Sequence, residues 1–179
     1  MVHLILGGAR SGKSKLAESL AATTNLPVTY IATATAGDQE MQSRITHHQQ
    51  QRPSSWNLIE EPLDLAKAIK SCGEGPRCIL VDCLTLWVSN LLMKQDPNVF
   101  DAAKESFLKT LEESQQSIIL VSNETGMGVI PMGEITRQFV DESGRLHQAI
   151  GEIADNVTLT MAGLPMPLKA QGKNCYSIT

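Results

Sequence analysis

A glycine-rich run near the N-terminus constrains the fold of this chain more than any other feature. Its residues are Gly7, Gly8, Ala9, Arg10, Ser11, Gly12, Lys13 and Ser14. They fit the pattern Gly-x-x-x-x-Gly-Lys-Ser/Thr, whose glycines let the backbone curl so that successive N–H groups point at phosphate oxygens. A short apolar run at residues 2–6 precedes the pattern, and a helical stretch at 13–24 follows it. This strand–loop–helix context predicts a phosphate-binding loop for a nucleoside triphosphate.

Each residue type in this loop is expected to have a separate chemical role. The helix that follows would present its positive N-terminal end to a bound anion. Lys13 is expected to reach the β- and γ-phosphates, and the Ser14 hydroxyl is expected to ligate Mg²⁺. Arg10 is a candidate for pairing with phosphate through two parallel hydrogen bonds.

Short apolar runs alternate with helical stretches along the rest of the chain, which predicts a mainly parallel sheet covered by helices. We expect further strands at residues 28–32, 78–81, 117–121 and 157–161, and a short one that ends near Glu60. The expected helices are 38–52, 62–70, 84–93, 100–113 and 134–153. After Gly163 the pattern is compatible with a hairpin or an edge strand. Together with the loop, it predicts an α/β, three-layer P-loop NTPase fold of the RecA-like type.

Length and composition narrow the class of protein further. The 179 residues suffice for one well-cored domain, so we expect a single domain over residues 1–179. Hydrophobic residues make up 42% and charged residues 19%, as in globular proteins. The net charge of −4 argues against nucleic acid, and no apolar run approaches the roughly 20 residues of a membrane span. The N-terminus has no basic region ahead of the loop, so we expect no leader and a cytoplasmic protein.

Asp82 ends the apolar run 79–81, where folds with this loop usually carry a second acidic residue. A carboxylate there binds Mg²⁺ directly or through water. The alternative is that Asp82 caps the helix expected from residue 84.

Ala32, Thr33 and Ala34 follow the expected strand 28–32. Because ligands of parallel sheets lie at the carboxyl ends of the strands, these residues are expected to line the nucleotide cleft.

Two further segments add specificity to the glycine loop. One reads Arg44-Ile-Thr-His-His48 with Arg52-Pro53, and the other reads Val121-Ser-Asn-Glu-Thr-Gly-Met-Gly-Val-Ile-Pro131. Supporting matches are Tyr30-Ile-Ala-Thr33 and Phe139-x-Asp141-x-x-Gly144-Arg145. Together they closely resemble the bifunctional adenosylcobinamide kinase / adenosylcobinamide-phosphate guanylyltransferase family of cobalamin biosynthesis, from residue 3 to about residue 163.

The resemblance implies that two reactions share one protein. A nucleoside triphosphate, ATP or GTP, first phosphorylates the aminopropanol hydroxyl of adenosylcobinamide. A GMP unit from GTP is then carried on a histidine and passed to the new phosphate, which gives adenosylcobinamide-GDP and releases pyrophosphate. The resemblance also implies Mg²⁺ as cofactor and a small homo-oligomer, a trimer.

Of the two adjacent histidines, His47 is the expected nucleophile. On a helix the two side chains point about 100° apart, so that His48 shares a partly apolar stripe with Met41 and Ile45, whereas His47 shares a polar stripe with Arg44. Neutral imidazole can attack phosphorus, and the family's modified histidine aligns with His47. We expect His48 to pack or to steady the site.

The resemblance carries further nucleotide contacts onto this chain. They fall on His48, Gln49, Gln50, Gln51, Glu60 and Asp82. The glutamines replace a more charged stretch, so their backbone is the stronger candidate ligand. For Glu60 a solvated edge glutamate is the alternative. The family usually carries glutamate in place of Asp82; if its partner is the guanine edge rather than Mg²⁺, the shorter carboxylate would loosen the preference for guanine.

Asn123 and Glu124 follow the expected strand 117–121 at the same end of the sheet, where they are candidates for a corrinoid or metal contact. The remaining histidines, His3 and His147, are expected to be a strand-start residue and a helix-surface residue. Two other functions remain open from sequence: a kinase that does not use His47, and a nucleotide-dependent switch.

Overall fold

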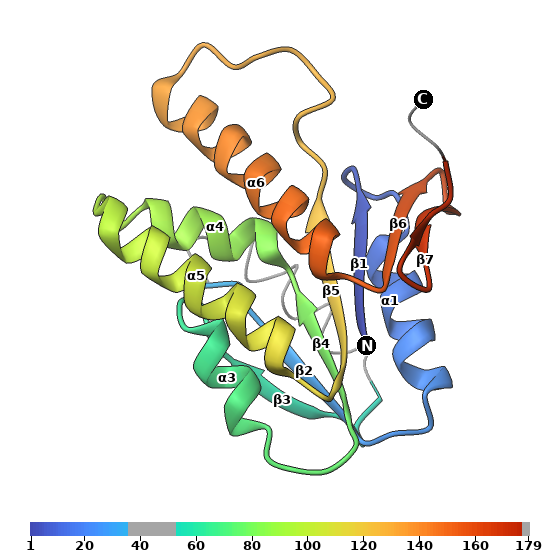
Figure 1. The fold of residues 1–179 in the computed structure, drawn as a ribbon. Coiled ribbons are helices and arrows are strands. Elements are labelled where there is room, and N and C mark those ends of the chain that lie inside the picture. The colour runs from blue at the N-terminus through green and yellow to red at the C-terminus, as the bar shows by residue number, and fades with distance from the viewer. Residues whose placement is uncertain (36–52, 177–179) are drawn as a thin grey trace.

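The computed structural model describes residues 1–35 and 53–176, which form an eight-stranded sheet with helices on both faces (Figure 1). In chain order the strands are β1 (Val2–Gly7), β2 (Val28–Ala32), β3 (Asn57–Glu60), β4 (Cys78–Asp82), β5 (Ser117–Asn123), β6 (Asn156–Met161), β7 (Leu164–Ala170) and β8 (Lys173–Asn174). Their order across the sheet is β3-β2-β4-β5-β1-β6-β7-β8. The strands from β3 to β6 in this order are parallel, and β7 and β8 complete the sheet as antiparallel strands.

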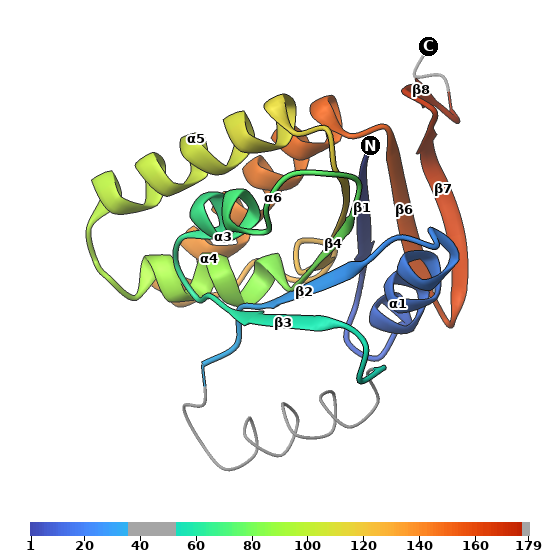
Figure 2. The ribbon, with the colours of Figure 1, turned by 90° about the horizontal axis from the view of Figure 1, so that it is seen from below.

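The helices divide unequally between the two faces of the sheet. They are α1 (Lys13–Thr23), α3 (Leu65–Ser71), α4 (Leu84–Leu92), α5 (Pro97–Glu113) and α6 (Glu134–Ile153). Among the helices of the described residues, α1 covers one face, and α3, α4, α5 and α6 lie on the opposite face, as Figures 1 and 2 show. The three layers predicted from the sequence are confirmed.

The central strands separate two apolar clusters because successive side chains point to opposite faces. In β1, Leu4 packs with the helices α3 to α6, whereas Ile5 packs with Ala17 and Ala21 of α1. Since both faces are covered, β4 and the middle of β5 are apolar without interruption rather than alternating. This is why a run such as that of β4 could be recognised as a buried parallel strand.

The order of the strands places β5 between β1 and β4. The register aligns their carboxyl ends: Gly7 lies beside Asn123, and Asp82 lies beside Val121 and Ala32. Glu60 at the end of β3 lies beside Ala32. The residues expected to bind nucleotide on four strands, and the candidate corrinoid or metal contacts on β5, therefore lie along one edge of the sheet, which is the RecA-like arrangement.

Two helices begin at residues other than those expected, because of their capping residues. Helix α5 begins at Pro97 rather than at residue 100: the Asp96 side chain accepts a hydrogen bond from the Asn98 N–H (3.0 Å), and proline suits the first helical turn. Helix α3 begins at Leu65 rather than at residue 62, behind the N-cap Asp64. The helix expected at 38–52 lies outside the described residues.

The chain after β6 forms a hairpin, which decides between the two alternatives left open by the sequence. Ala162 and Gly163 adopt positive φ values of 52° and 78° and reverse the chain, so that β7 pairs antiparallel with β6. The hairpin also places Gly163 against the phosphate loop, where its N–H donates to the Ser11 carbonyl oxygen (2.9 Å).

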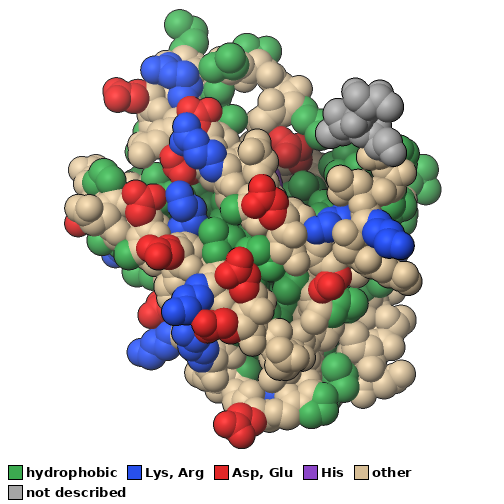
Figure 3. All heavy atoms as spheres, viewed as in Figure 1, with side chains coloured by type: hydrophobic (Ala, Val, Ile, Leu, Met, Phe, Trp, Pro, Cys, Tyr) green, Lys and Arg blue, Asp and Glu red, His purple; other side chains and the backbone are tan. Residues whose placement is uncertain are grey.

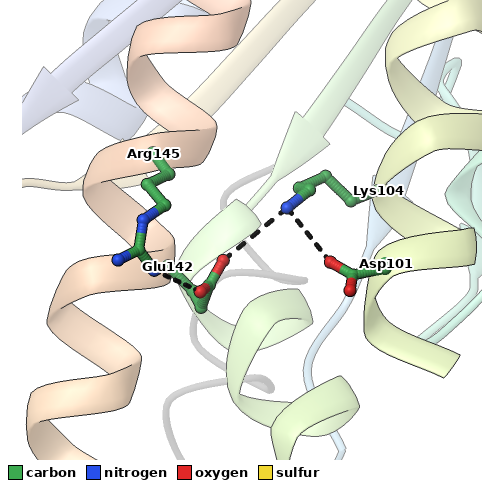
Figure 4. A network of polar contacts seen from close by, with 4 residues as sticks. All are labelled: Asp101, Lys104, Glu142 and Arg145. Atoms are coloured by element: carbon green, nitrogen blue, oxygen red, sulfur yellow. Dashed lines mark hydrogen bonds and ion pairs between the residues drawn. The ribbon is translucent and has the colours of Figure 1, made fainter. Parts of the chain in front are cut away.

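Helices α5 and α6 are joined by a chain of charged side chains (Figure 4). Lys104 on α5 lies 3.2 Å from Asp101 and 3.7 Å from Glu142 on α6, which also pairs with Arg145. Arg145 thus forms an ion pair within its own helix. Lys104 and Glu142 are largely covered and hold the two helices in register next to the apolar cluster.

Charged side chains of both signs are interspersed over the face seen in Figure 3. Apolar side chains gather at its upper end, where the loop that precedes α6 carries the exposed Met127, Val129, Ile130 and Met132. None of the helices in the described part of the chain is long and apolar enough to cross a membrane.

Trp87 should be a main contributor to stability. Its side chain is fully buried, its Nε1 donates to the Leu63 carbonyl oxygen (2.7 Å), and its ring centroid lies 5.0 Å from that of Phe107. We expect Trp87→Ala to lower the free energy of unfolding by about 3–5 kcal/mol. The measurement is urea denaturation, with Val99→Ala as a half-exposed control that should change stability by less than about 0.5 kcal/mol. Equal effects of the two substitutions would contradict this account of the core.

Candidate functional site

The phosphate loop connects β1 to α1 and requires glycine at two positions. A Cβ on Gly7 would lie 2.4 Å from Ser11 Oγ and 2.5 Å from the Thr160 carbonyl oxygen, so no larger residue fits. Gly12, which caps α1, has φ = 96°, in the left-handed region that disfavours a side chain. The loop is therefore shaped by close backbone approach at one end and by backbone conformation at the other.

Lys13 and Ser14 open helix α1 directly after this turn. The Lys13 ammonium lies over the loop, and its Nζ donates to the Gly8 carbonyl oxygen (3.1 Å). The Ser11 N–H donates to the same carbonyl oxygen (3.3 Å), which closes the turn. Arg10 is exposed, with φ = 56°. The first turn of α1 and the Lys13 ammonium thus meet on the same side of the loop.

Asp82 lies at the carboxyl end of β4, two strands from the loop. Its neighbour Cys83, not Asp82, is the N-cap of α4, and no side chain caps that helix; the capping alternative for Asp82 is wrong. Burial, and after it the Asp82 carboxylate, raise the pKa of the Cys83 thiol to about 11, and the Lys13 ammonium opposes this shift. Cys83 therefore lies within electrostatic range of both Asp82 and Lys13.

Hydrogen bonds hold the residues after β2 next to the carboxyl end of β4. Thr33 is fully buried, and its hydroxyl donates to the Cys83 carbonyl oxygen (2.7 Å) and accepts from the Cys83 N–H (3.0 Å). The Thr33 carbonyl oxygen accepts from Asn90 (2.9 Å). The Thr33 side chain thus positions the backbone beside Asp82, while Ala32 and Ala34 are half-buried at the edge.

Other predicted contacts stand apart from this group. Glu60 is exposed at the end of the edge strand β3. His47, His48, Gln49, Gln50 and Gln51 lie outside the described residues. The described part of the chain holds no cluster of three or more His, Cys, Asp or Glu side chains suited to a metal ion.

His147 was expected on a helix surface, and this prediction is wrong. Its side chain is only 9% exposed, its Nε2 lies 2.8 Å from Ser122 Oγ, and its Nδ1 lies 3.8 Å from Glu124 Oε2. The signal was present in the helical spacing, because residues 143, 146 and 150 form the buried face of α6 and residue 147 shares that face. His3 lies in β1, as expected, and contacts Thr158.

A hydrogen-bonded network extends from His147 across the end of β5. Ser122 Oγ lies 3.3 Å from Thr85 Oγ1, which accepts a hydrogen bond from the Asn123 N–H (2.7 Å). Burial lowers the pKa of His147, and the Glu124 carboxylate opposes that shift. The imidazole is therefore held neutral at neutral pH in a fixed position behind Glu124.

Glu124 itself is attached to the phosphate loop. Its N–H donates to the Gly7 carbonyl oxygen (3.1 Å), and its Oε1 accepts from the Gly126 N–H (2.6 Å). It lines a cavity of about 330 Å³ together with the loop. The other lining residues are Gly8, Ala9, Arg10, Ser11, Met127, Leu159, Thr160, Met161 and Ala162.

Solved structures share this architecture at low sequence identity. A protein of Pyrococcus horikoshii is similar with a TM-score of 0.59 at 10% identity, over 97% of this chain and 90% of that one. The RadB recombinase is similar with a TM-score of 0.51 at 15% identity, over 88% of this chain and 73% of that one. These likenesses bear on the fold, and they agree with the RecA-like sheet.

Sequence relatives match over nearly the whole chain. The bifunctional adenosylcobalamin biosynthesis protein CobP of Pseudomonas aeruginosa is 58% identical, over 96% of this chain and 99% of the relative. The corresponding protein CobU of Escherichia coli is 35% identical, over 94% of this chain and all of the relative. The family model described as cobinamide kinase / cobinamide phosphate guanyltransferase matches residues 3–168. With a phosphate loop, an acidic strand end and a polar network gathered at one edge of its sheet, this chain belongs to the cobinamide kinase / cobinamide phosphate guanyltransferase family of enzymes.

Proposed function

We propose that this chain catalyses two consecutive reactions on one corrinoid, as a single domain over residues 1–179. It phosphorylates the aminopropanol hydroxyl of adenosylcobinamide with a nucleoside triphosphate, and it then transfers GMP from GTP to the new phosphate. The observation that carries the proposal is the family match over residues 3–168, which includes a fully formed phosphate loop. The bifunctional name of the 58% identical relative supports the pairing of the two activities.

For the kinase step, the loop would hold the triphosphate through its backbone N–H groups and the N-terminus of α1. Lys13 would leave the Gly8 carbonyl oxygen and pair with the β- and γ-phosphates, where its charge offsets the negative charge of the transition state. The other loop residues in the proposed nucleotide site are Gly7, Gly8, Ala9, Arg10, Ser11, Gly12 and Ser14.

Ser14 and Asp82 fit the requirements of Mg²⁺, which takes few protein ligands and completes its shell with phosphate oxygens and water. Ser14 opens α1, and Asp82 ends β4. Asp82 and Lys13 both act on the pKa of the Cys83 thiol, in opposite directions. Bound there with the nucleotide, the ion would neutralise phosphate charge. A carboxylate at this point also balances the charge of the lysine.

For the second step, we propose His47 as the covalent carrier of GMP. A ring nitrogen of His47 would attack the α-phosphorus of GTP, forming an N–P bond as the bond from phosphorus to the bridging oxygen breaks and pyrophosphate departs. A phosphate oxygen of the corrinoid would then attack the same phosphorus and release the histidine. The support is the sequence match around His47.

The proposed site extends across the sheet edge to other nucleotide contacts. These are Ala32, Thr33, Ala34, His48, Gln49, Gln50, Gln51, Glu60 and Asp82. Ala32 lies beside both Asp82 and Glu60 in the sheet register, so a nucleotide that spans from the loop toward β3 would pass all three. We further propose a cytoplasmic enzyme, since ATP and GTP are cytoplasmic metabolites, and a homo-oligomer, a trimer, which rests on the family resemblance alone.

The first experiment tests the covalent step. Purified protein is incubated with α-labelled GTP and Mg²⁺, and the chain is examined for acid-labile, base-stable label. We expect wild-type protein to be labelled, and His47→Ala to lose the label together with at least about 1,000-fold of guanylyl transfer, while kinase turnover remains. His48→Ala is the matched control and should keep the label. Equal loss of both activities in a folded His47→Ala protein would contradict the assigned role.

Lys13 tests the phosphate loop. Lys13→Ala removes the charge that offsets the triphosphate, so we expect it to depress kinase turnover and guanylyl transfer by about 100-fold or more, with weaker nucleotide binding. Steady-state kinetics of both half-reactions and calorimetry with a non-hydrolysable nucleotide measure these effects. The exposed Lys15 of the same helix provides the control, Lys15→Ala, which should retain both activities. A full kinase rate in Lys13→Ala would show that the triphosphate binds elsewhere.

Asp82 tests the metal contact. Asp82→Asn keeps the size of the side chain but removes its charge, so we expect both activities to require a higher Mg²⁺ concentration for half-maximal rate. Titration of Mg²⁺ at fixed nucleotide measures this. An unchanged Mg²⁺ dependence combined with altered discrimination between GTP and ATP would instead assign Asp82 to the guanine edge.

A further inference from the structure

The cavity of about 330 Å³ beside the phosphate loop has features of a site for a polar ligand. It is bounded by Gly8 and Ala9 on one side and by Glu124 on the other. Ser11 and Thr160 also line it, and their hydroxyl oxygens are buried with no hydrogen-bond partner in the described part of the chain. Buried hydroxyl groups are normally satisfied, so rotation of either hydroxyl toward a polar group in the cavity would supply the missing partner.

Glu124 is held at this cavity from two directions. Its backbone N–H is bonded to Gly7, the first residue of the loop motif, so residue 124 cannot move independently of the loop. Its carboxylate is oriented by the Gly126 N–H at 2.6 Å and faces His147 Nδ1 at 3.8 Å. The carboxylate side chain remains 21% exposed, which leaves it accessible to a ligand.

The network behind Glu124 has a consistent direction. Thr85 Oγ1 accepts a hydrogen bond from the Asn123 N–H, so the Thr85 hydroxyl is free to donate to Ser122 Oγ. We assign Ser122 as the donor to Nε2 of His147 across their 2.8 Å distance, which places the proton of the neutral imidazole on Nδ1, the nitrogen that faces Glu124. The imidazole N–H dipole then stabilises the position of the carboxylate without adding a positive charge.

From this arrangement we propose that the cavity receives the alcohol arm of the phosphoryl acceptor, that Glu124 is the general base of the kinase step, and that His147 is its positioning residue. This inference rests on the proposed function. It assigns the acceptor side of the reaction, whereas the phosphate loop and Asp82 serve the donor side.

The step balances as an in-line phosphoryl transfer. The acceptor hydroxyl oxygen forms a bond to the γ-phosphorus, and the bond from that phosphorus to the β,γ-bridging oxygen breaks. The nucleoside diphosphate leaves with the electron pair, and the hydroxyl proton passes to the Glu124 carboxylate. The cavity borders Gly8 and Ala9, in the half of the loop that precedes Lys13, so the acceptor would approach the phosphates from this side.

The neutral state of His147 matters for this role. Burial is the main cause that lowers its pKa, and Ser122 and Glu124 are its hydrogen-bond and charge partners among the described side chains. A charged imidazolium would stabilise the carboxylate and make it a weaker base. A neutral donor orients Glu124 while leaving it able to take a proton.

The test compares the two half-reactions in Glu124→Gln, which keeps the size of the side chain but cannot accept the proton. We expect kinase kcat to fall about 100-fold or more, with KM for the nucleotide retained. Labelling by α-labelled GTP should be unchanged, because guanylylation of the chain consumes no acceptor hydroxyl. Glu112→Gln on α5 is an exposed control that should behave as wild type, and thermal melting checks that each variant is folded.

The positioning role of His147 has its own readout. We expect His147→Ala to lower kinase kcat, and His147→Asn, which keeps an N–H donor near Nδ1, to recover part of it at equal thermal stability. If His147 had a purely structural role, the kinase kcat of the two variants would instead change in parallel with their thermal stability.

The outcomes separate this inference from the proposed function. A wild-type chain with neither kinase activity nor label would overturn the proposed function itself. An active wild type whose Glu124→Gln variant keeps its full kinase rate would overturn the assignment of the base alone. Parallel loss of kinase activity and label in a folded Glu124→Gln protein would place Glu124 in nucleotide binding, which also overturns it.

Discussion

The close approach of three backbone segments around Gly7 is the constraint on which the rest of the site depends. The loop folds over the end of β1 because glycine leaves room for Ser11 and for the Thr160 carbonyl oxygen of β6. The same glycine accepts the Glu124 N–H from the end of β5. One position without a side chain thus joins the ends of three parallel strands, and it sets the loop, the cavity and Glu124 in fixed relation.

The order of the strands places different chemical groups on the two sides of the site. Toward β4 and β2, the edge carries Asp82 and the Thr33 hydroxyl that braces its neighbour Cys83. Toward β6, it carries the cavity, with Glu124 and buried hydroxyl groups. A metal-bound nucleotide suits the first side, and an uncharged alcohol suits the second. A bifunctional enzyme of this size needs such a division, because its two reactions use the same new phosphate in succession.

Local features were predictable from sequence, and long-range pairings were not. The glycine loop, the buried strands and α6 follow from patterns within a few residues, so their expected positions agree closely with the structure. The starts of α3 and α5 differ because Asp64 and Asp96 cap them. The helical spacing of α6 places His147 on its buried face, but its partner Ser122, 25 residues away, could not be predicted; the N-cap of α4 falls on Cys83, one residue after Asp82. The segment with His47 stays a prediction.

The position of β1 in the sheet has a consequence for biosynthesis of the chain. This first strand pairs with β5 and β6, the latter more than 150 residues downstream, where His3 lies beside Asn156. Gly163 then completes the bracing of the loop. During synthesis β1 leaves the ribosome well before β6, so it cannot complete its pairing in the sheet until more than 150 further residues have been made. The phosphate loop that follows β1 therefore reaches its final shape late in folding, and the apolar β1 is prone to aggregation until β6 pairs with it.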